Sequence, residues 1–354
     1  MIHQHLINSL NQLNLLRQLE VPEKNITLTP ADHKNIFIAK FTHKTNYVSL
    51  VFFVGAFLAQ MKMTKQISSL QGYFDQLNEN FDEQKKLLPG IFESRRIDPT
   101  FKRSVQITVL LVGTSIANIV TSVMNQPTRV IPLSDVFMFC KHFVKLSSLS
   151  YCLEFCTLCS MLEYHFVYIN SILCQMATVE KVWYKPWFGS SLEKVGIWHR
   201  TLCETLNEVN RMHQLQSLLS VVSWTIHLLP HLFLFGIRLI GSEDSKEYYS
   251  VIQFVLSIRY IVMIYLRCHF TSNVTYEANK TKMHLCNFLM KYKDEQLIAQ
   301  IKTILQQMSC GNTEFRLCGL VIISTSFFLS TMLAVVGYFI IILQSYMSEL
   351  DSEN

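Results

Sequence analysis

Long stretches with few or no charged residues constrain this chain more than any other feature. A helix that crosses a bilayer needs about 20 mostly apolar residues, and charge inside hydrocarbon is costly. Four uncharged stretches and two weaker ones meet this pattern: Tyr47–Met61, Ser104–Thr128, Met212–Ile237 and Leu317–Ser348, then Val136–Leu162 and Tyr248–Leu266. With 50% hydrophobic and 16% charged residues, the sequence predicts an all-α, multispanning membrane bundle with six clear spans rather than water-soluble domains.

Positive charge alternates between the connections that join these spans. Three segments are rich in Lys and Arg, with eight in Lys62–Arg103, five in Lys181–Arg211 and seven in Arg267–Arg316. The other connections between spans hold one or none, and no Lys or Arg follows Arg316. Because cytoplasmic connections carry the excess of Lys and Arg, the rich segments are expected in the cytosol. The C-terminus is then extracellular.

The cytoplasmic segments have apolar residues at helical spacing, which predicts helices rather than loose loops. The steps are three and four residues in three sets: Ile67, Leu70, Phe74, Leu77 and Phe81; Leu202, Leu206 and Val209; Leu297, Ile301, Ile304 and Met308. The region Leu133–Val179 would be about 70 Å long as one helix, well beyond a membrane. We therefore expect long helices that extend into the cytosol, packed against one another or against neighbouring subunits.

Several functional classes find no support in the residues. The net charge of +5 is modest and is spread between spans, so no nucleic-acid partner is predicted. The Cys156–Cys159 spacing has no second pair at zinc-like distance, and these cysteines are read as small packing residues. His227 and His231 are four residues apart but lack the Glu of a HExxH motif. No metal, no cofactor and no enzymatic activity are predicted.

The end of the last span carries the most specific motif of the chain. Tyr338 is followed by five hydrophobic residues, Gln344 and Ser345. This resembles the signature that closes insect gustatory receptors, which is Thr-Tyr, five hydrophobic residues and Gln-Phe. Gly337 and Ser345 stand where that signature has Thr and Phe. The resemblance covers the chain from about Thr45 onward.

This resemblance implies a tetrameric, ligand-gated cation channel in the plasma membrane, with an inverted topology and seven spans. The first span would be weak or missing within 1–44, the ligand-binding bundle would occupy 45–268, and a cytoplasmic linker with an amphipathic helix would occupy 269–316. The last span, 317–348, would line the pore and leave an extracellular tail, 349–354. Membrane lipid and sister receptors, in a homo- or hetero-tetramer, are the implied partners.

Small or mildly polar residues on one face of the last span suit a pore. Ser326, Ser330, Ala334, Gly337 and Ile341 recur at three- and four-residue steps, a pattern that also suits a close helix–helix seam. The resemblance places Gln344 and Ser345 near the extracellular gate. The predicted pore and gate residues are Ser330, Ala334, Tyr338, Ile341, Gln344 and Ser345.

The resemblance also places a ligand pocket in the outer half of the bundle. Pockets of this kind are mostly apolar with a few polar anchors, and the candidates are Asn118, Thr121, Trp224, His227, His231, Tyr249 and Gln253. Trp224, His227 and His231 share a helix face and form the best pocket wall, although interfacial anchoring explains the same residues. Glu154 and Arg259 are charges within the weaker spans and are candidates to pair with each other.

Other receptor and transporter classes fit less well. A G-protein-coupled receptor would have a cytoplasmic C-terminus, and neither an Asp-Arg-Tyr nor an Asn-Pro-x-x-Tyr motif occurs at the expected spans. An insect odorant receptor shares the inverted topology, but the spacing from Tyr338 to Gln344 favours the gustatory branch. A secondary transporter would often show repeated halves, and none stands out. A pocket with few charges favours a neutral or amphipathic tastant over a sugar.

Overall fold

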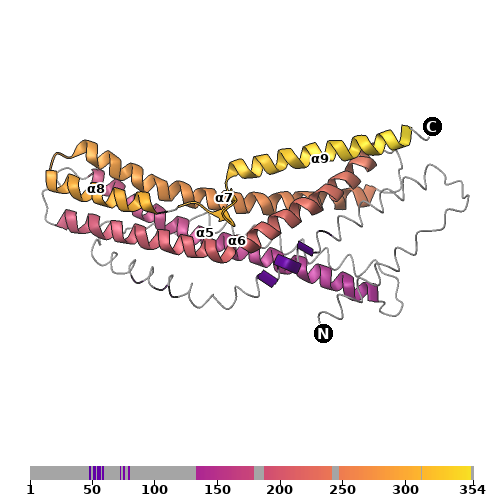
Figure 1. Ribbon diagram of the computed structural model, residues 1–354, viewed down its shortest axis with the longest axis horizontal. Coiled ribbons are helices and arrows are strands. Elements are labelled where there is room, and N and C mark those ends of the chain that lie inside the picture. The colour runs from indigo at the N-terminus through magenta and orange to yellow at the C-terminus, as the bar shows by residue number, and fades with distance from the viewer. Residues whose placement is uncertain are drawn as a thin grey trace, which may run out of the picture.

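The computed structural model describes residues 133–178, 187–240, 247–311 and 313–351, with some single residues between 48 and 79. The span predicted at Ser104–Thr128 and the stripe residues from Ile67 to Phe81 lie outside the described residues, and the span predicted at Tyr47–Met61 is described only in part. Figure 1 shows long helices along one axis, with a small hairpin near the middle. The elements are α5 Leu133–Thr178, α6 Trp187–Ile240, α7 Glu247–Lys291, α8 Glu295–Cys310, β1 Arg316–Leu317, β2 Val321–Ile322 and α9 Thr325–Asp351.

Helices α5, α6 and α7 form the body of the bundle. Their 46, 54 and 45 residues correspond to about 70 to 80 Å each, more than twice the thickness of hydrocarbon. The prediction that the bundle contains helices much longer than a membrane span is confirmed. In Figure 1, α8 folds back at one end of the bundle, whereas α6 and α9 finish at the other. The first part of α6 and the last part of α7, which belong to the basic segments Lys181–Arg211 and Arg267–Arg316, lie at the α8 end (Figure 1).

The two predicted apolar stripes that fall on described helices are buried. Leu202, Leu206 and Val209 on α6 are fully enclosed, and Leu297, Ile301, Ile304 and Met308 on α8 are at most 7% exposed. Helix α8 begins where expected because the Asp294 side chain accepts hydrogen bonds from the amides of Gln296 and Leu297. The amphipathic helix predicted before the terminal span is thereby confirmed, and it packs on α6 and α7.

A polar network on the α8 side of the bundle fastens α5 to α7. The Asn170 side-chain amide donates to the Glu277 carboxylate at 2.8 Å and to the Glu277 carbonyl at 2.9 Å. The Thr281 hydroxyl donates to the Asn170 amide oxygen at 2.7 Å, and Lys280 lies 3.2 Å from the Glu277 carboxylate. Asn170 is 4% exposed, so both of its polar ends are used inside the protein.

The start of the terminal span differs from the prediction. A continuous span from Leu317 was expected, but β1 and β2 form an antiparallel hairpin in which Arg316 pairs with Ile322. Gly319 at φ 73° supplies the left-handed turn, which glycine adopts without strain. Helix α9 begins only at Thr325, because the Ser324 hydroxyl accepts from the Phe327 amide and caps it. Apolar, uncharged residues made the hairpin indistinguishable from helix in a hydropathy pattern.

Within the described residues, three helices are long and apolar enough to cross a membrane. The qualifying segments are Phe188–Ile237, Phe254–Lys291 and Thr325–Ser348. They include Met212–Ile237 and most of the predicted Tyr248–Leu266 and terminal spans, while Val136–Leu162 falls on α5. The boundary predicted between 268 and 269 lies inside α7, which continues without a break to Lys291. The full count of six spans and the orientation of the bundle stay predictions.

Candidate functional site

Trp224, His227 and His231 on α6 face α7. The Tyr260 ring of α7 stacks on His227 at 5.5 Å and on His231 at 5.7 Å between ring centroids. Trp224 and His227 are 2% and 1% exposed, unlike anchors at a membrane rim, which meet water or headgroups. Pro230 lies between the two histidines, inside α6. Spacing in the sequence predicted that Trp224, His227 and His231 lie together. It could not predict that Tyr260 joins them, because sequence does not show which helix faces α6.

For the other four predicted ligand contacts, the structure gives at most a position along a helix. Tyr249 and Gln253 lie in the first turns of α7, at the end of the bundle where α9 also finishes (Figure 1). Asn118 and Thr121 lie outside the described residues. Among the described residues, no group of three or more His, Cys, Asp or Glu side chains is arranged to hold a metal ion.

A buried arginine lies two helical turns along α7 from Tyr260. Arg267 is fully enclosed, and its guanidinium carbon lies 5.0 Å from the Phe155 ring centroid, 5.2 Å from that of Trp224 and 5.9 Å from that of Tyr151. Rings at such distances attract a cation through their negative faces. Trp224 thus contacts Arg267 and precedes His227 by less than one turn. The rings around Arg267 and the rings of His227, His231 and Tyr260 therefore form one continuous aromatic layer between the helices of the bundle.

The candidate pair of Glu154 and Arg259 is not formed in the described part of the chain. No ion pair joins these two residues, which are both partly buried. Arg267 is the charge that the fold encloses instead. In the sequence, Arg267 directly follows an apolar stretch. That position predicts the start of a cytoplasmic segment rather than the interior of a helix bundle.

Helix α9 turns its two faces to different surroundings. Phe339 and Tyr346 point towards α6, and Tyr346, which is 4% exposed, meets the Phe233 ring at 5.7 Å. Val335 is 2% exposed and belongs to the main core of the bundle. A Cβ atom on Gly236 of α6 would lie 2.9 Å from the Phe339 ring, so glycine is what lets the helices approach here. The six predicted pore and gate residues are all exposed, as is most of α9 in the single chain: Ser330, Ala334, Tyr338, Ile341, Gln344 and Ser345.

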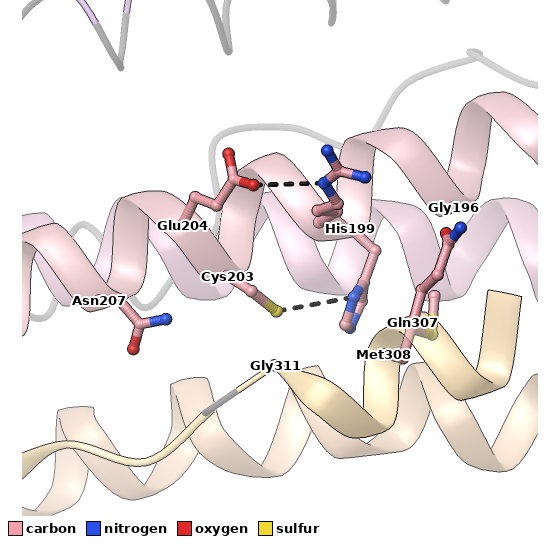
Figure 2. Close-up of a pocket in the computed structure, with 9 residues that line it drawn as sticks. Gly196, His199, Cys203, Glu204, Asn207, Gln307, Met308 and Gly311 are labelled. Atoms are coloured by element: carbon pink, nitrogen blue, oxygen red, sulfur yellow. Dashed lines mark hydrogen bonds and ion pairs between the residues drawn. The ribbon is translucent and has the colours of Figure 1, made fainter.

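A cavity of about 210 Å³ lies between α6 and α8 (Figure 2). Its wall includes His199, whose Nε2 donates to the Ala278 carbonyl at 3.2 Å, so that Nδ1 is left to accept from the Cys203 thiol at 3.6 Å. At the rim, Arg200 bonds Glu204 at 3.2 Å. Figure 2 shows both pairs bonded across one helical turn of α6. These four polar groups already bind one another, and Asn207 and Gln307 are the other polar side chains of a wall that is otherwise apolar. We assign the cavity no polar ligand.

His165 on α5 gives this end of the bundle a dependence on pH. It is 5% exposed and packs against the Trp198 ring at 6.3 Å, and its burial lowers its pKa to about 4. The unfolded chain binds the proton more tightly, with a pKa of about 6.5. The contribution of His165 to the free energy of unfolding is therefore complete above about pH 6.5. It is lost as the pH falls towards 4, and the loss is about 2 kcal/mol at pH 5.

The midpoint of thermal unfolding of detergent-solubilised protein should fall less between pH 7.5 and pH 5 in His165→Phe than in the wild type. Equal falls in the two proteins would contradict this role of His165.

Comparison with known proteins identifies the family. Two solved structures of the olfactory receptor OR5 from the insect Machilis hrabei, one of them in complex with eugenol, are similar at 12% and 11% identity; each alignment covers 96% of this chain and 99% of that one, with TM-scores of 0.48 and 0.46. No curated protein sequence matches. Residues 29–349 match the family described as 7tm chemosensory receptor, which confirms the family relationship that the closing motif predicted. The chain belongs to this chemosensory receptor family.

Proposed function

We propose that this protein is a gustatory receptor that opens a non-selective cation channel when a small molecule binds. Four subunits, identical or mixed with sister receptors, surround one pore in the plasma membrane of a chemosensory neuron. The α9 helices line the pore, and the ligand binds in the outer half of each bundle, between α6 and α7.

The observation that carries this proposal is the uncovered face of α9. This helix has the highest mean hydropathy of the three candidate spans, yet only 6% of its most apolar window is buried in the single chain. Its exposed residues include the small or mildly polar Ser330, Ala334 and Ser345, interspersed with large apolar residues such as Leu333 and Ile341. A face of this kind suits a water-filled path whose apolar positions gate it by dewetting. Lipid and neighbouring subunits would cover the remaining exposed residues.

The proposed ligand is a neutral or amphipathic tastant. The wall formed by Trp224, His227, His231 and Tyr260 offers aromatic surface and a few hydrogen-bonding nitrogens and oxygens, as pockets for such compounds do. Asn118, Thr121, Tyr249 and Gln253 complete the proposed set. A sugar would require many more polar partners than this wall supplies.

Recording membrane current from cells that express the chain, across a panel of tastants and odorants, tests this function. The expected result is an inward cation current with a small set of neutral tastants. Responses to odorants alone would favour the alternative of an odorant receptor-like channel. Ligand-dependent uptake with no current would favour a secondary transporter and overturn the channel.

Ser345 stands near the proposed extracellular gate, where related receptors have Phe. Its hydroxyl bonds back to the Ile341 carbonyl at 2.9 Å, so the side chain adds little apolar bulk to the exposed face. Ser345→Phe should narrow and dry the gate and so lower the basal current measured without ligand. Ser309→Phe on the exposed face of α8 is the control and should leave the basal current unchanged. An unaltered leak in Ser345→Phe would argue against this position of the gate.

A further inference from the structure

Arg267 has hydrogen-bond donors that nothing in the described bundle satisfies. Its Nη1 donates to the Ser217 carbonyl at 3.4 Å, a long bond, while Nε and Nη2 have no partner. The side chain is 0% exposed, and no carboxylate among the described residues pairs with it. The aromatic rings stabilise the faces of the guanidinium, but its N–H groups point outward in the plane, where a ring face does not meet them.

Further unsatisfied polar atoms gather on the face of α6 that meets Arg267. They are His213 Nε2, Gln216 Oε1, Ser217 Oγ and Ser220 Oγ, at helical steps of three and four residues. Ser217 bonds Arg267 through its carbonyl, and Ser220 lies between Ser217 and Trp224, which both contact the guanidinium. These atoms therefore lie around one charge rather than scattered through the core.

His213 belongs to the same cluster through shared rings. Its ring centroid lies 5.2 Å from that of Phe155 and 4.9 Å from that of Tyr151, the two rings that Arg267 also contacts. Its Nδ1 is hydrogen-bonded to the Tyr151 hydroxyl. If Nδ1 accepts that bond, Nε2 carries the proton and is a donor. The cluster then has one net positive charge and several donors, and Gln216 Oε1 is its one unsatisfied atom that can only accept, since the Ser217 and Ser220 hydroxyls can donate as well as accept.

Donors in excess around a buried cation match the chemistry of an anion. A buried group without its hydrogen bond costs about 1 to 3 kcal/mol, and a charge costs more. We propose that Arg267, His213, Ser217 and Ser220 form a site for a small monovalent anion, such as chloride or a carboxylate, between α5, α6 and α7. The anion neutralises Arg267 and joins the three helices beneath the aromatic layer. This site adjoins Trp224 of the proposed tastant pocket, but its four residues belong to no part of that pocket, and the proposal does not depend on channel function.

Thermal unfolding of the full chain in detergent, at matched ionic strength, tests the proposal. Sodium chloride, bromide and formate are compared with gluconate, which is too large for a site enclosed by three helices. The midpoint should rise with chloride or bromide and saturate, since a ligand of the folded state stabilises it. A rise with formate but not with halide would assign the site to carboxylates. Equal midpoints in all four salts would overturn the proposal.

Two variants and one control identify the residues. Arg267→Gln should abolish the dependence on the anion, and persistence of that dependence would overturn the assignment. If Arg267→Gln does not fold, Ser220→Ala decides: loss of one hydrogen bond to a charged group should raise the half-saturating anion concentration about tenfold. An unchanged concentration in Ser220→Ala would count against the site. Ser309→Ala, exposed on α8, should titrate as the wild type does.

Discussion

Cysteine at Ala334 or Ile341 should make the ligand-evoked current sensitive to a positively charged, membrane-impermeant thiol reagent applied from outside. Both residues lie on the exposed face of α9, which we assign to the pore. A tethered cation about 4 Å from a permeating cation adds about 1 kcal/mol to its barrier even at the dielectric constant of water. With one such charge on each of several subunits the current should fall about tenfold or more, since about 1.4 kcal/mol is a factor of ten.

Val335→Cys is the matched control for this experiment. Val335 is adjacent to Ala334 but only 2% exposed, because it belongs to the buried core. Its thiol should not react, and its current should persist. The wild type, treated in the same way, measures any contribution from the native exposed thiols of Cys174, Cys286 and Cys318. Equal block at Val335 and Ala334, or no block at any position of the exposed face, would remove α9 from the pore.

Asn170→Leu should destabilise the bundle by about 2 to 4 kcal/mol, because it removes one member of a buried polar network. The Glu277 carboxylate, in a residue 9% exposed, would lose its 2.8 Å donor, and the Thr281 hydroxyl would lose its 2.7 Å acceptor. Leucine has a similar volume, so the loss reports the polar contacts rather than a cavity. The measurement is the thermal or denaturant midpoint of detergent-solubilised protein.

Asn287→Leu on α7 is the control for this substitution. Asn287 is exposed on the same helix as Glu277, so the same chemical change there should shift the midpoint little. If Asn170→Leu and Asn287→Leu unfold at the same midpoint as the wild type, the network does not fasten α5 to α7 as described.

Helical periodicity was sufficient to predict two of the buried helix faces in this fold. The steps through Leu202, Leu206 and Val209, and those through Leu297 to Met308, identified the buried faces of α6 and α8. Such patterns succeed because a helix that buries one face must repeat apolar residues every three or four positions. The break after Cys310 was also visible, since Gly311 ends α8.

The hairpin and the buried arginine could not be predicted in the same way. Leu317 to Ile322 are apolar enough for a membrane helix, and only the capping by Ser324 and the turn at Gly319 distinguish the structure they adopt. Arg267 and Tyr260 require knowledge of which face of α7 meets α6, and sequence periodicity does not supply pairing between helices. Trp224 and His227 were found because they share one helix, where spacing alone sets their proximity.

Pro230 gives α6 a point of low bending stiffness between His227 and His231. A proline removes one hydrogen bond of the helix and clashes with the preceding turn, so bending costs least there. The segment beyond it carries Phe233 and Gly236, which hold Tyr346 and Phe339 of α9. A molecule bound against the two imidazoles would therefore bend α6 at Pro230 and displace the segment that contacts α9. Helix α7 has no proline in its 45 residues and would stay straight.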